Sequence, residues 1–192
     1  MRRVIAGWML ALSVAAWLGF SLFLFGSRYE AVASRVAPAP LLEEWPVTAP
    51  IDVSAVLDTL GTDGREAYAS FQQLDSVNAT LAAGVIAILI LFCVERFGRR
   101  TAWRGLAILP AGLLTAELVE NMTLSRLIAA YPDVAAGSIT LLGTATRAKF
   151  VFGLVAFVIA IACLFGAIVG TVRRRGFEED DEPTLNPDAE TT

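Results

Sequence analysis

The sequence predicts an all-α membrane protein: a polytopic four-helix bundle whose second, third and fourth helices extend beyond the outer leaflet, with a short outer amphipathic helix. Three observations lead to this fold class. Hydrophobic residues make up 56% of the 192 residues, charged residues make up only 18%, and the mean hydropathy is +0.62. Four apolar runs approach the roughly 20 residues that cross a hydrocarbon layer of about 30 Å. Arginine clusters flank these runs on one side only, as the positive-inside rule requires of membrane spans.

The first apolar run covers residues 4–25 and follows Arg2 and Arg3. Residues 31–33 read Ala-Val-Ala, which resembles the cleavage site of a signal peptide. The run is longer than the roughly 7 to 15 apolar residues of a signal peptide. We therefore expect a retained transmembrane helix.

The outer segment, residues 27–79, contains its own helices. In IDVSAVLDTL, the apolar positions Val53, Val56, Leu57 and Leu60 follow helical spacing, and Gly61 can end the helix. This pattern predicts a short amphipathic helix on the membrane surface or on the bundle. Residues 63–66 then have the form of a capping box, so the second helix is expected to begin at about residue 64 and to span the membrane over residues 80–97. At 1.5 Å per residue it is roughly 50 Å long and stands several turns above the outer leaflet.

The third and fourth helices are predicted from the remaining apolar runs. The third spans residues 103–120 and continues to Ala130, where a Tyr-Pro-Asp sequence ends it, and Pro110 is expected to bend it by removing one helical hydrogen bond. The fourth begins near Ser138 and spans residues 150–172. Small residues repeat along one face of the first and fourth helices and predict close helix packing there. They are Gly7, Ala11, Ala15 and Gly19 in the first, and Gly153, Ala156, Ala160, Cys163, Ala167 and Gly170 in the fourth.

With four spans, all the arginine clusters fall on the cytoplasmic side, so both termini are cytoplasmic and residues 27–79 and 121–149 face outward. Residues 1–175 form the transmembrane domain. Residues 176–192 carry seven acidic side chains and are predicted to be a disordered cytoplasmic tail. Fourteen of the fifteen basic residues are Arg. Together with the abundance of Ala, this suggests a GC-rich bacterial genome and hence the cytoplasmic (inner) membrane of a bacterium.

The composition also excludes several kinds of site. The chain has no histidine, which rules out an imidazole base, a His-ligated haem and a His-containing zinc or copper site. Cys93 and Cys163 lie at different depths and outside any C-x-x-C motif, so we interpret both as packing residues. No metal or cofactor is predicted. Nucleic acid is not a predicted partner, because topology already explains the arginine clusters.

Polar residues converge at one depth near the outer boundary of the membrane, and we predict that they form an outward-facing polar cup. Lys149 heads the small-residue face of the fourth helix, so it points toward other helices. An unpaired charge at the centre of the bilayer costs about 2.5 to 3.5 kcal/mol, which favours pairing Glu117 with Lys149 or Arg147. The candidate ligand-binding residues are Arg65, Tyr68, Asp75, Glu117, Glu120, Asn121, Arg147 and Lys149.

Less specific interpretations of these residues stay open. Glu120 and Asn121 can simply mark where the third helix leaves the lipid. Arg65, Tyr68 and Asp75 can form a solvated face of the second helix.

Short motifs add a resemblance. With Gly64-Arg65-x-x-Tyr68, Asp75 and Glu117-x-x-Glu120-Asn121, the chain resembles a group of small four-helix bacterial integral membrane proteins of unknown function over residues 50–172. Glu117 stands where the pattern of that group has Asp. The resemblance implies the fold and the place of the polar cluster, and it implies no activity.

The leading hypothesis is that the cup binds an amphiphilic ligand, such as a lipid headgroup or an isoprenoid, that enters from the outer leaflet. A membrane enzyme with Glu117 or Asp75 as general acid or base is one alternative. A scaffold that assists a membrane-protein partner is another. A path for protons or ions is less favoured, because the carboxylates cluster at one depth and Glu95 is the one acidic candidate farther in.

Overall fold

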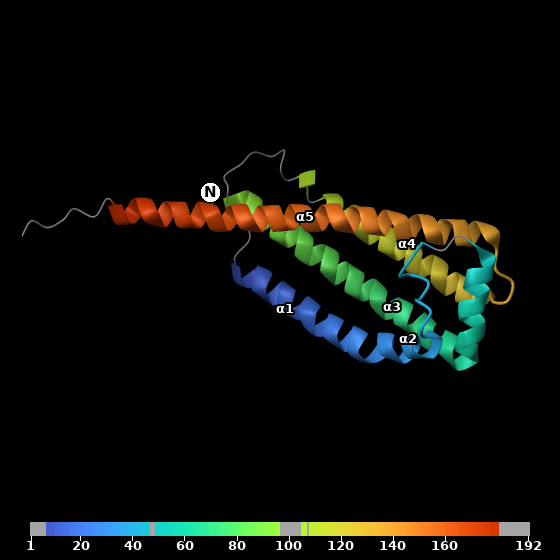
Figure 1. Ribbon diagram of the computed structural model, residues 1–192. Coiled ribbons are helices and arrows are strands. Elements are labelled where there is room, and N and C mark those ends of the chain that lie inside the picture. Colours follow the sequence, from blue (N-terminus) through green and yellow to red (C-terminus); the bar gives the residue numbers. More distant parts are fainter. Residues whose placement is uncertain (1–6, 47–48, 97–104, 107, 181–192) are drawn as a thin grey trace, which may run out of the picture.

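The computed structural model describes residues 7–46, 49–96, 105–106 and 108–180 (Figure 1). These residues are helical apart from short turns, and they contain no strand. The elements in chain order are α1 (Gly7–Phe23), a π-helical segment η1 (Leu24–Tyr29), α2 (Glu30–Val36), α3 (Pro50–Arg96), α4 (Ile108–Ala130) and α5 (Ala136–Asp180). The predicted all-α class is confirmed.

Three helical segments among the described residues are long and apolar enough to cross a membrane: Gly7–Val36, Ile51–Glu95 and Ala136–Gly166. This fits a membrane protein. α4 is not one of the three. The predicted third span, residues 103–120, lies partly outside the described residues, and its described part carries both Glu117 and Glu120.

The helices do not pack as four equal members of a bundle. α3, α4 and α5 each contact the other two, whereas the described residues of α1 pack against α3 and not against α4 or α5 (Figure 1). The small-residue face predicted for the first helix is wrong, because Ala11, Ala15 and Gly19 are exposed. Larger side chains such as Val14 and Trp17 are the half-buried ones, because bulky apolar groups bury more area against α3 than small ones do.

The small-residue face of α5 packs as predicted at Gly153, Ala156 and Ala160, and the prediction for Ala167 and Gly170 falls outside the described side chains. Ala156 and Ala160 are buried. A Cβ atom built on Gly153 would lie 3.6 Å from Leu113 of α4. α4 and α5 therefore approach closely along this line.

The main apolar core lies at the end of the molecule where α2, the start of α3 and the turn between α4 and α5 meet. The predicted amphipathic helix forms the start of α3, which stands across the end of the bundle (teal in Figure 1) and turns into the long part of α3 at Gly61. Gly61 has φ 62° and ψ −173°, a conformation that glycine adopts without steric cost. The apolar face of this first part of α3 packs against the other helices, since Val53, Leu57 and Leu60 are buried in one cluster with residues of α2, α3, α4 and α5.

Element ends agree with the sequence in part. α4 ends at Ala130 as predicted, and α5 begins two residues before Ser138. The expected bend at Pro110 is wrong, because Pro110 lies in the first turn of α4, where a main-chain N–H has no helical partner to lose. α5 continues to Asp180, so the first five residues of the predicted tail, 176–180, are helical; residues 181–192 lie outside the described part of the chain.

Candidate functional site

A buried ion pair joins α4 and α5 next to the main apolar core. The ammonium of Lys149 contacts a carboxylate oxygen of Glu120, whose side chain is fully buried. The other oxygen of Glu120 accepts a hydrogen bond of 2.5 Å from the hydroxyl of Thr146. Thr146 and Lys149 are three residues apart on α5, so one helix face supplies both partners. Glu120 is therefore held at both oxygens.

Glu43 completes this cluster from the segment between α2 and α3. Its main-chain carbonyl oxygen accepts a 3.2 Å hydrogen bond from Lys149, and its carboxylate accepts one from the Tyr68 hydroxyl. The same hydroxyl accepts a 3.1 Å bond from the backbone N–H of Leu42. Burial raises the pKa of the Glu43 carboxyl to about 7, while the Tyr68 hydrogen bond and the charge of Lys149 oppose that rise. One short segment is thus fixed to both α3 and α5.

A second polar contact links α3 and α4. The side-chain amide of Asn121 donates to Asp75 at 3.2 Å and to the Ser76 hydroxyl at 3.3 Å. Nearby on α3, Gln72 is buried, and neither its side-chain oxygen nor its side-chain nitrogen has a hydrogen-bond partner among the described residues. The three long helices are therefore tied together by polar groups at one level.

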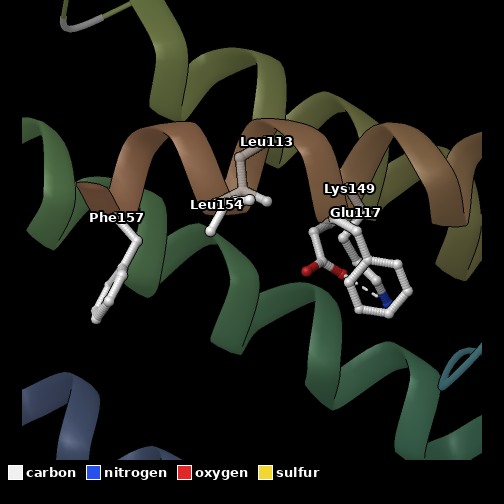
Figure 2. A pocket seen from close by; sticks show the side chains of 7 residues that line it. Leu113, Glu117, Lys149, Leu154 and Phe157 are labelled. Atoms are coloured by element: carbon white, nitrogen blue, oxygen red, sulfur yellow. Dashed lines mark ion pairs between the residues drawn. The ribbon is translucent and has the colours of Figure 1, made fainter. Parts of the chain in front are cut away.

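A groove of about 470 Å³ opens between α4 and α5 beside the ion pair. Its polar end is formed by Glu117 and Lys149, whose Oε2 and Nζ atoms lie 3.8 Å apart (Figure 2). Its other lining residues are apolar or glycine: Leu113, Phe150, Gly153, Leu154 and Phe157. The expected pairing of Glu117 with a cation is confirmed for Lys149. The groove therefore has one charged end and one apolar wall.

A second groove of about 380 Å³ lies along other residues of α4 and α5, among them Gly112, Val119 and Phe152. Its polar lining comes from Thr115 and Thr144, and none of its described lining residues is charged. The groove at Glu117 is therefore the better candidate for a specific site.

The structure brings together six of the eight predicted cup residues: Tyr68, Asp75, Glu117, Glu120, Asn121 and Lys149. Arg65 and Arg147 are not among them. Arg65 donates a 2.9 Å hydrogen bond to the carbonyl oxygen of Leu57, and its guanidinium lies 4.8 Å from the ring centre of Tyr131. Arg147 is exposed. It is two residues from Lys149, a spacing that turns a helical side chain to a different face.

Two members of the cluster were missed by the sequence analysis. Glu43 sits in a Pro-rich irregular stretch, where no periodicity indicates its direction. Thr146 is one turn before Lys149 on the same helix face, and that spacing could have identified it.

The described residues contain no group of three or more acidic or cysteine side chains placed to hold a metal ion. Cys93 is buried and Cys163 half-buried, as expected of packing residues. The site therefore surrounds the ammonium of Lys149 with several carboxyl groups. One of them, Glu117, lies at the edge of an apolar groove.

No protein-family model, no curated protein and no solved structure matches this chain.

Proposed function

We propose that this chain is an integral membrane protein that binds an amphiphilic small molecule, such as a lipid, in the groove between α4 and α5. The observation that carries the proposal is the continuity of the groove. One end is the Glu117–Lys149 ion pair, and the wall next to it is formed by Leu113, Leu154 and Phe157 (Figure 2). An amphiphile likewise has a polar head that is followed by an apolar chain.

The proposed threading orients such a ligand correctly. With four spans and cytoplasmic termini, α5 enters the membrane from outside, so Phe157 lies eight residues, or about 12 Å, deeper than Lys149. α4 runs the other way, and Leu113 is deeper than Glu117. The polar end of the groove is then near the outer boundary of the bilayer, and the apolar end faces the acyl chains.

The site is also built to keep its shape. Lys149 is held by Glu120 and by the carbonyl of Glu43, and Glu120 is held by Thr146. A preorganised site loses less conformational entropy when a ligand binds. The preorganised side chains therefore support a ligand-binding role for the groove.

A test is to fill the groove without changing any charge. Gly153→Phe places a ring on the groove floor, and Val158→Phe adds the same ring at an exposed position of α5. Each protein is purified from membranes in a mild detergent and examined by native mass spectrometry. Wild type and Val158→Phe are expected to retain an amphiphile of defined mass that Gly153→Phe has lost.

Equal retention by all three folded proteins, or none in wild type, would contradict the proposal. The scaffold alternative predicts the second of these results. The enzyme alternative, with Glu117 or Asp75 as acid or base, also needs a substrate in this groove, so turnover is worth testing only after binding has been found.

A further inference from the structure

We infer that the polar end of the groove selects a cationic head, so the ligand is an amphiphile that carries an ammonium group rather than a phosphate or carboxylate. This inference rests on the proposed function and names the chemical class of its ligand.

Among the described lining residues of the groove Lys149 is the one basic residue, and two of its three N–H donors are already used. An ammonium has three N–H donors. Two are directed to Glu120 and to the carbonyl oxygen of Glu43, and the Glu117 carboxylate at 3.8 Å is a third acceptor close by. An anionic head would have to displace Glu120 or the Glu43 carbonyl, or compete with the Glu117 carboxylate for the third donor. Lys149 therefore neutralises the protein's own carboxylates and has little left to offer an anion.

Charge in the cluster is unbalanced toward the acidic side. Glu43, Glu117 and Glu120 all act electrostatically on Lys149, and Asp75 acts on Glu117. The two arginines predicted to join the cluster lie elsewhere, Arg65 against Tyr131 and Arg147 exposed. Even without Glu43, which holds its proton up to a pKa of about 7 because of burial, three carboxyl groups surround one ammonium. Such a site attracts a cation and repels a phosphate.

Glu117 is the acidic group best placed to meet a ligand. Its side chain is 20% exposed and lines the groove, whereas Glu120 is fully buried. Within the described chain Glu117 receives no hydrogen bond, and its contact with Lys149 is longer than a hydrogen bond. Its carboxylate is free to accept a charge-assisted bond from an ammonium head.

Two further features agree. The buried polar atoms without a partner at this level are three acceptors, Oε1 of Glu43, Oδ1 of Asn121 and Oε1 of Gln72, and one donor, Nε2 of Gln72, so unused acceptors outnumber unused donors. The ring of Phe150 lines the groove and already lies 5.6 Å from the Lys149 nitrogen. Aromatic rings attract cations. Each feature favours an ammonium.

The experiment uses three photoreactive probes with the same diazirine-bearing alkyl chain and different heads: a primary amine, a phosphate and a hydroxyl. Each probe is added in equal amount to the full chain in nanodiscs of phosphatidylcholine, irradiated, and quantified by mass spectrometry of peptides from α4 and α5. Charge-assisted pairing with Glu117 predicts labelling by the amine about tenfold above that by the phosphate. Glu117→Gln should bring this ratio close to one.

Glu66→Gln is the matched control, because it removes one negative charge at an exposed position of α3 outside the groove. It should leave the ratio unchanged. Groove labelling in which the phosphate probe equals or exceeds the amine would overturn the inference and leave the proposed function standing. An amine preference unaffected by Glu117→Gln would also overturn it. If no probe labels wild type more than Gly153→Phe, the proposed function itself fails.

Discussion

The ammonium of Lys149 donates a hydrogen bond of 3.2 Å to the main-chain carbonyl oxygen of Glu43, which lies 106 residues earlier in the chain. The contact fixes the segment between α2 and α3 to the start of the long apolar part of α5. It also places Glu43 beside Tyr68 and near Glu120. One lysine thus organises the polar end of the bundle, and the first two predictions follow from this arrangement.

Replacing Lys149 with Met should destabilise the protein by about 3 to 5 kcal/mol, because it leaves the fully buried Glu120 without its ionic partner. Thermal unfolding in detergent measures the change. Arg147→Met is the control, since Arg147 is exposed and its loss should change stability by about 0.5 kcal/mol or less. The double variant Lys149→Met, Glu120→Gln should recover part of the loss. If the double variant were as unstable as Lys149→Met alone, lost packing and not the unpaired charge would explain the destabilisation.

Stability should fall as the pH rises from about 5 to about 8. The pKa of Glu43 is raised to about 7 in the folded protein, and the carboxyl of an unfolded chain titrates near its ordinary value of about 4.3. The folded state therefore holds this proton more tightly. The resulting stabilisation is complete below the unfolded pKa and is lost as the pH passes through the folded one.

The variant Glu43→Gln checks the assignment, because it should flatten the dependence of the unfolding temperature on pH over this window. Glu44→Gln is the comparison. Glu44 is the exposed neighbour, and its replacement removes the same charge. An equally steep dependence in Glu43→Gln would assign the effect to another group.

Gly112→Ala should destabilise the contact between α4 and α5 by about 1 to 3 kcal/mol, the usual effect of overpacking. A Cβ atom at Gly112 would lie 2.9 Å from two ring carbons of Phe152, so the ring must move. Gly84→Ala in α3 meets no atom within 4 Å and should instead stabilise by about 0.5 to 1 kcal/mol through helix propensity. Chemical unfolding of the two variants compares them directly. If both substitutions increased the free energy of unfolding, the ring of Phe152 would have moved aside without a measurable cost.

Gly61→Ala should cost about 1 to 3 kcal/mol, because φ 62° with ψ −173° is a region that residues with a Cβ rarely occupy. There is open space around the position, so strain and not a clash is the cause. The substitution should destabilise the part of α3 before Gly61 more than the other helices. Hydrogen exchange of residues 51–60 compared with residues 80–90 measures this, and uniform protection across both segments would contradict it.

The sequence alone determined the features that depend on local composition. The apolar runs predicted helices long enough to cross a membrane, glycine predicted the break at residue 61, and Tyr-Pro-Asp predicted the end of α4 at Ala130. Helical spacing also placed Asp75, Glu117, Glu120, Asn121 and Lys149 at one level. These properties arise from hydrophobicity, backbone preference and the 3.6-residue period, which act within one helix.

The tertiary structure decided which faces meet. Periodicity along one helix carries no information about the rotation of its neighbour, so the contact of Arg65 with Tyr131 could not be predicted. The face of α1 that packs on α3 was unpredictable for the same reason. Glu43 was missed because an irregular segment has no period to extrapolate, and its place depends on contacts with Tyr68 and Lys149 far away in the chain. The groove beside Glu117 likewise exists only because α4 and α5 approach each other along Gly153 and Leu113.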